Sequence, residues 1–174
     1  MAGDAAQADT HAATDAGAGP PLRLWRPDSP AAALGLAVSH LMTKPVFANL
    51  RFGEWSRVLV GQVNRGHYCF AVDAGGQVQG FAGWALTTPD KAEGWVTGTR
   101  PLAYDECLRG DCLVFNAWSA NSNAVHRFLV GQARIFGQRA RMMYFRRYYP
   151  DGRVRPVRLP VNDFVPGHIR RGAG

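Results

Sequence analysis

The stretch from Cys112 to Phe136 carries the clearest change of hydrophobic pattern in the chain. Residues 112–118 are apolar except for Asn116 and follow a Gly-Asp turn pair, which is typical of a buried strand. Residues 119–123 are polar and suit a helix cap, because such side chains accept hydrogen bonds from the first backbone N–H groups. Apolar side chains then recur at helical spacing up to Phe136. The pattern predicts a strand, a polar turn and an amphipathic helix.

Two further helices are predicted nearer the N-terminus. A Ser-Pro pair at residues 29–30 is a start signal, an apolar stripe covers residues 34–42, and Pro45 is expected to end this helix. A second amphipathic pattern covers residues 54–64, and Gly66 is its expected stop.

The remaining elements are predicted to be mostly strands. Aromatic, β-branched or alternating residues indicate strands at residues 67–72, 78–86, 141–145 and 153–159. Pro156 places the last of these at a sheet edge, because proline cannot donate a ladder hydrogen bond. Residues 87–104 contain several Pro and Gly and are expected to form a short helix or loops. This order predicts an α+β fold, a mainly antiparallel sheet with flanking helices.

Composition divides the chain into three parts. Residues 1–21 contain almost no large apolar side chain, so burial cannot offset the entropy of ordering them, and we expect a disordered N-terminal tail. Residues 22–160 form the predicted domain. Residues 161–174 are expected to be an irregular C-terminal tail.

The charge balance points to an acidic partner. The net charge is +7, the pI is about 9.9, and half of the 20 Lys and Arg lie after Ala133. An acidic carrier protein, a nucleic acid or an anionic membrane surface would each be attracted. The three cysteines show no metal-binding spacing and suit a reducing compartment. We see no metal site, membrane span or signal peptide in the sequence and expect a cytoplasmic protein.

Three stretches, in order, carry a family resemblance. They are Leu34-Gly35 with Leu41 to Pro45, then Gly80 to Ala85, then Leu108 to Asp111 with Val114 to Trp118. They resemble the opening helix, a strand ending in Trp-Ala, and the Ser-Gly-Asp stretch of the RTX-toxin-activating lysine acyltransferases, the hemolysin-activating family. The resemblance spans roughly residues 34–160.

The resemblance implies an acetyltransferase-like (GNAT-like) fold, a dimer, and transfer of a fatty acyl group from acyl carrier protein to a lysine of an RTX-type protoxin. In that family a histidine follows the first helix and an aspartate lies in the central strand. The matching positions here are Phe47 and Asn116. Phenylalanine cannot move a proton and asparagine does not ionise, so the chain is a divergent member by this resemblance. A replacement for the histidine would require His40, two turns upstream.

Several residues near the central strand are candidates for binding an acyl group. Asn116 can orient an acyl carbonyl or an amine, or simply bond a neighbouring loop. Ser119 and Asn121 lie in the following polar turn, and Trp84 and Trp118 suit either an apolar acyl pocket or the core. Residues 119–123 lack glycine, so no phosphate-binding loop of the kind used for CoA follows the strand. This weakens CoA as the donor and leaves acyl carrier protein, the donor that the resemblance implies, possible; we expect no bound cofactor.

Several other reactive side chains could serve either a structural or a functional role. Ser39 and His40 lie beside the first helical stripe, and His67 opens a strand. His126 falls in the first turn of the central helix, where it can meet an anion. Cys112 is expected to be a core residue.

The arginines after Ala133 are the strongest indication in the sequence of a binding partner. Arg141, Arg146 and Arg147 are expected to bind the carrier or another partner. Tyrosines between them also allow single-stranded nucleic acid to bind by charge and stacking, although no nucleic-acid motif is present. Three hypotheses follow: an acyltransferase, a non-catalytic adaptor of the same fold, and a basic nucleic-acid-binding domain.

Overall fold

Six strands form one sheet in chain order. The computed structural model describes residues 21–149 and 151–161. All neighbouring strands are antiparallel except β4 and β5, which are parallel. The predicted α+β class and mainly antiparallel sheet are confirmed. The strands are β1 (Arg23–Trp25), β2 (Tyr68–Val72), β3 (Val78–Thr87), β4 (Cys112–Ala120), β5 (Met142–Tyr148) and β6 (Val154–Pro160).

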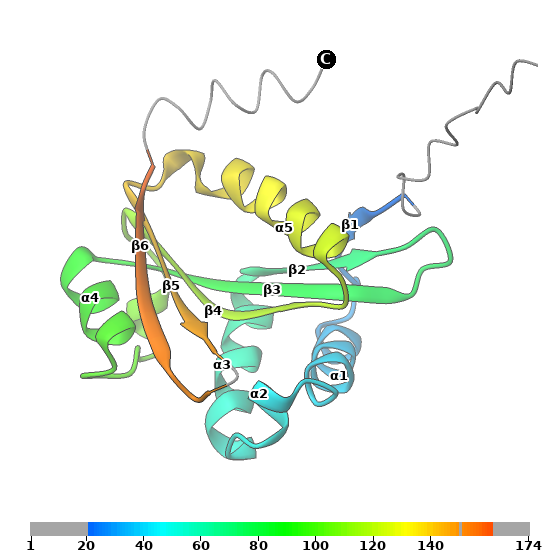
Figure 1. Cartoon of the computed structure of the whole chain (residues 1–174), viewed down its shortest axis with the longest axis horizontal. Helices are drawn as coiled ribbons and strands as arrows, with labels where there is room; N and C mark the ends of the chain where they lie inside the picture. Colours follow the sequence, from blue (N-terminus) through cyan, green and yellow to red (C-terminus); the bar gives the residue numbers. More distant parts are fainter. Residues whose placement is uncertain (1–20, 150, 162–174) are drawn as a thin grey trace, which may run out of the picture.

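Helices cover both faces of this sheet. Figure 1 shows α1 and α3 on one side of β2–β4, α5 on the other side, and α4 beside β5 and β6. Phe81 and Leu59 belong to the core under α1 and α3, Leu113 and Leu129 to the core under α5, and Val96 to a third cluster under α4. The helices are α1 (Pro30–Leu41), α2 (Pro45–Ala48), α3 (Phe52–Arg65), α4 (Pro89–Thr97) and α5 (Asn123–Phe136), with 3-10 turns η1 (Asp105–Cys107) and η2 (Gly137–Arg139).

Local capping signals explain where the longer helices begin and end. The Ser29 hydroxyl accepts a hydrogen bond from the backbone N–H of Ala32 at 3.3 Å, and Pro30 is the first helical residue. Gly66 ends α3 in the left-handed conformation, with φ of 68°. Ser122 caps α5 in the same manner as Ser29 caps α1. The predicted caps and stop are confirmed at these three positions.

Two predictions about the N-terminal region are wrong. The first helix ends at Leu41 rather than at Pro45, and Pro45 instead begins the separate helix α2. Proline is favoured at a first helical turn because its missing N–H has no helical acceptor there. Met42 belongs to the predicted apolar stripe but is 59% exposed, because the helix has already ended. The short strand β1 was not predicted, since three residues carry too little pattern.

Strand β4 is irregular at Asn116. Its neighbours Phe115 and Ala117 pair with the consecutive β3 residues Trp84 and Gly83, so Asn116 is an extra residue in the ladder. This is a β-bulge, which interrupts the alternation of side chains. Pairing of β4 with β5 also stops here, because Phe115 is the last β4 residue with a β5 partner. Figure 1 shows the β5–β6 hairpin turning away from the line of β3 and β4.

The expected terminal tails fall almost entirely outside the described residues, which begin at residue 21 and end at residue 161. Within the described part, none of the helices has the length and apolar character needed to cross a membrane.

Candidate functional site

The second half of β4 collects polar side chains on the face covered by α1 and α3. Because the bulge adds one residue, Asn116 and Ala117 both point toward this face: Asn116 contacts α3, and Ala117 belongs to the core shared with α1 and α3. Ser119 then points toward α1. The bulge therefore brings two of the predicted site residues to the same helical layer.

A buried histidine–serine pair joins α1 to β4. The His40 Nε2 and Ser119 Oγ atoms are 3.1 Å apart, and the two residues are 8% and 7% exposed. His40 lies in the last turn of α1 and Ser119 near the end of β4. The sequence could not place them together, because 79 residues separate them along the chain.

Burial keeps His40 neutral. The pKa of His40 is lowered from 6.5 to about 4, first because burial penalises the charged imidazolium and second because of the Lys44 charge. At neutral pH one ring nitrogen therefore carries a lone pair. If Nε2–H donates to the Ser119 hydroxyl, Nδ1 is the nitrogen left to accept a proton.

A hollow of about 460 Å³ opens beside this pair. Its far wall is the turn after β2 and the start of β3, and Asn121 closes one side. Asn121 is held in place by Lys44 Nζ, 2.6 Å from its Oδ1, and by the Gln79 side chain at 3.1 Å. The lining residues are Trp25, Leu36, Ser39, His40, Thr43, Gly76, Gln77, Val78 and Asn121.

Asn116 takes part in a second polar contact at the bulge. The fully buried Gln62 of α3 donates from its Nε2 to the Asn116 Oδ1. Gly83 lies directly against the Gln62 amide, where a Cβ atom would collide with it. The Gln62 Oε1 is buried against Gly83 without a hydrogen-bond partner in the described part of the chain.

His67 is a further polar group beside the bulge. Its ring stacks on Trp84 at 6.1 Å, and its Nδ1 is buried without a partner among residues 21–149 and 151–161. Burial lowers the pKa of His67, and the charges of Arg65 and Arg26 lower it further. His67 is therefore held neutral, as His40 is.

The two predicted tryptophans occupy different environments. Trp84 is 6% exposed in the α5 core, stacked on Phe136 with ring centroids 5.0 Å apart. Trp118 is partly buried at the start of α5, and its Nε1 donates to the His126 Nδ1 at 3.2 Å. Neither residue belongs to the hollow beside His40.

Phe47 lies in α2 and packs beside the α1–α3 core. Its ring is 6.5 Å from that of Trp55. Phe47 is therefore a packing residue, whereas His40 carries the imidazole that reaches β4.

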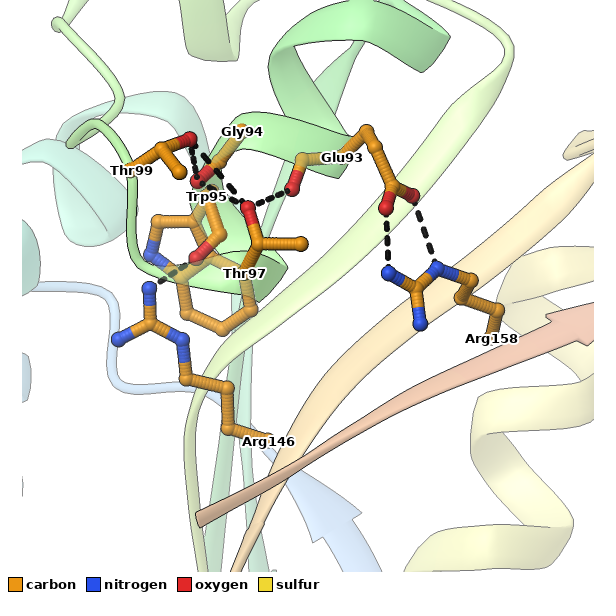
Figure 2. A network of polar contacts seen from close by, with 7 residues as sticks. All are labelled: Glu93, Gly94, Trp95, Thr97, Thr99, Arg146 and Arg158. Atoms are coloured by element: carbon orange, nitrogen blue, oxygen red, sulfur yellow. Dashed lines mark hydrogen bonds and ion pairs between the residues drawn. The ribbon is translucent and has the colours of Figure 1, made fainter.

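The three predicted partner-binding arginines differ in what they contact. Figure 2 shows the Arg146 guanidinium donating to the Trp95 carbonyl oxygen of α4, and it also lies 4.5 Å over the Trp95 ring. Arg147 is exposed near the hairpin tip, 5.2 Å over Tyr149. Arg141 is exposed just before β5, where its backbone bonds Asp111 and Val161.

The cysteines do not suit nucleophilic chemistry. Cys69, Cys107 and Cys112 are buried and free. Burial raises the pKa of Cys69 to about 12, and burial with the Asp111 charge raises the pKa of Cys112 to about 11. Among the described residues no group of three His, Cys, Asp or Glu side chains could hold a metal ion.

Sequence reasoning did not single out Gln62 or Lys44. Gln62 lies one turn before the C-terminus of a helix with an exposed face, where glutamine is normally solvated. Its burial depends on Gly83, because a side chain at this β3 position would occupy the space of the Gln62 amide.

Comparison of the sequence with models of known protein families, and separately with curated proteins, finds no match in either case.

Proposed function

We propose that this protein is an acyltransferase that moves an acyl group from a carrier-protein thioester to an amine, in the manner of the toxin-activating lysine acyltransferases. The observation that carries the proposal is the buried His40–Ser119 pair beside the hollow. A neutral imidazole fixed by a hydroxyl is the minimal arrangement for removing a proton from an attacking amine.

In this proposal His40 is the general base and Ser119 is a positioning residue. The lysine amine attacks the thioester carbonyl carbon, the C–N bond forms, and the C–S bond breaks to release the carrier thiol. His40 accepts the proton that the amine loses and returns it to the leaving sulfur. With a pKa near 4, His40 is a weak base before ligands bind. An anionic group on the incoming partner would offset the Lys44 charge, the smaller of the two causes, and so raise that pKa in part.

The bulge supports the binding of an extended thioester arm. Beyond Phe115, β4 has no partner on the β5 side within the described residues, so its backbone edge can hydrogen-bond an amide-containing chain. The acetyltransferase-like fold is proposed from the family resemblance, and the mainly antiparallel six-stranded sheet with helices packed on it is compatible with that fold.

A second function, that of a non-catalytic binding module, is favoured by one observation. Both positions that match the family's ionisable residues are engaged in packing or neutral hydrogen bonds, Phe47 with Trp55 and Asn116 with Gln62. In this case the carrier binds but no acyl group is transferred.

Intact-mass spectrometry separates the two functions. The protein is mixed with acyl carrier protein charged with a fatty acyl group and with a lysine-containing RTX-type protoxin fragment. We expect an acyl mass on the fragment with the native protein, at least a tenfold slower rate with His40→Gln, and an unchanged rate with His126→Gln as the matched control. Binding of the carrier without any transfer would favour the binding module, and full activity of His40→Gln would refute His40 as the base.

A further inference from the structure

The tip of the β5–β6 hairpin holds an unusual pair of like charges. Arg147 of β5 and Arg155 of β6 are direct cross-strand partners, and both are exposed. Like charges directly opposite one another destabilise a strand pair. Among the described residues neither arginine has a carboxylate within 4 Å, whereas the nearby Arg153 pairs with Asp151.

An aromatic ring orders part of this tip. The Arg147 and Arg153 guanidinium carbons lie 5.2 Å and 5.1 Å from the centroid of the Tyr149 ring. Such cation–π contacts restrict long side chains that would otherwise be mobile. Because two guanidiniums already lie over the ring, Tyr149 is poorly placed to stack on a nucleic-acid base.

The opposite face of the hairpin is fastened to α4. Figure 2 shows Arg158 bound to the Glu93 carboxylate and Arg146 bound to Trp95, so the charges of these two arginines are already engaged. Side chains alternate along a strand, so Arg147 and Arg155 point away from this α4 face. The contacts with α4 thus hold the hairpin in place while the guanidinium groups of Arg147 and Arg155, which pair with no carboxylate in the described part of the chain, face away from α4.

We infer that Arg147 and Arg155, with Arg153 beside them, form a docking surface for an acidic helix of the acyl-donating carrier protein. Direct cross-strand partners have Cα atoms about 4.5–5.5 Å apart. Two acidic residues at positions i and i+4 of a helix have Cβ atoms about 5–6 Å apart. The two arginines therefore match two carboxylates on one helix face, and each guanidinium can bind a carboxylate through two parallel hydrogen bonds.

This inference rests on the proposed function for the identity of the partner, and a binding experiment tests it without acyl transfer. The probes are fluorescently labelled acyl carrier protein without an acyl group, a helical peptide with Glu at i and i+4, and the same peptide with Gln. We expect the carrier and the Glu peptide to bind, with affinity falling as salt rises, and the Gln peptide to bind at least tenfold more weakly.

Charge reversal tests the residues. Arg147→Glu/Arg155→Glu is expected to weaken carrier binding at least tenfold, whereas Arg147→Lys/Arg155→Lys retains most of it. Arg139→Glu, an exposed arginine of η2, is the matched control and should bind as the native protein does. Equal weakening by the control, or tighter binding of a single-stranded oligonucleotide than of the carrier through the same arginines, would overturn the proposal.

A small-molecule acyl thioester distinguishes this proposal from the proposed function. The charge-reversed variant should transfer an acyl group from the small thioester at the native rate while losing transfer from the carrier. If neither donor supports transfer but the carrier still binds through Arg147 and Arg155, the docking surface stands and the catalytic proposal fails. If both donors support transfer and charge reversal leaves carrier binding unchanged, the docking surface fails alone.

Discussion

Replacing Gly83 with alanine is expected to destabilise the protein strongly. A Cβ atom at this position would collide with the Oε1, Cδ and Nε2 atoms of Gln62. The Gln62 amide is the flexible end of its side chain, but it is fully buried and bonded to Asn116, so it has little room to move. Overpacking a core costs about 1–3 kcal/mol. Losing a buried hydrogen bond costs about 1–3 kcal/mol more, so we expect a loss of about 2–6 kcal/mol.

Urea unfolding followed by far-UV circular dichroism measures this loss. Gly131→Ala is the matched control, because Gly131 lies inside α5 with no atom within 4 Å of its Cβ position. Alanine is the better helix former, so this control is expected to gain about 0.5–1 kcal/mol.

A double-mutant cycle isolates the collision. In the Gln62→Ala background the added methyl group has space, so the two substitutions should couple favourably by about 1 kcal/mol or more. A loss below about 0.5 kcal/mol for Gly83→Ala, or purely additive effects with Gln62→Ala, would refute the tight contact between β3 and α3.

Three further predictions follow from burial and capping. Because the pKa of His40 falls from 6.5 to about 4 on folding, the unfolded state binds the extra proton between these values. Stability should therefore be constant above pH 6.5 and fall by about 3 kcal/mol toward pH 4, a slope that urea titrations of His40→Gln should lack. Cys69 and Cys112, with pKa values raised to about 12 and about 11, should resist iodoacetamide at pH 8 in the folded protein and react in urea, as intact mass would report. Ser29→Ala should cost about 1 kcal/mol in thermal or urea unfolding, and an unchanged midpoint would show that its hydroxyl does not cap α1.

Local signals in the sequence were sufficient for most elements. The Ser-Pro start of α1, the glycine stop of α3 and the apolar run of β4 each depend on neighbouring residues, and the structure has them where the pattern predicted. The edge position of β6 followed from Pro156 for the same reason. The sequence predicts a short helix or loops for residues 87–104, and the helix α4 forms there.

The geometry of the candidate site was beyond reach of the sequence pattern. Asn116 reads as one polar residue in a strand, and nothing local shows that it is an extra residue in the ladder. His40 and Ser119 meet only because α1 crosses the end of β4, which depends on the packing of the whole sheet. Arg146 and Arg147 are adjacent in sequence, yet one is used by α4 and the other faces outward, because strand side chains alternate.

The parallel pairing of β4 with β5 has a consequence for biosynthesis. As the chain leaves the ribosome, β4 can pair with β3 as soon as β4 has emerged. The opposite edge of β4, at Cys112–Phe115, has no partner until Met142–Phe145 of β5 have been synthesised. Until α5 has been made and has crossed the sheet, this apolar edge is open to other nascent chains. A stalled or truncated product ending within α5 is therefore expected to aggregate or to require a chaperone, whereas one that includes the β5–β6 hairpin closes its own edge.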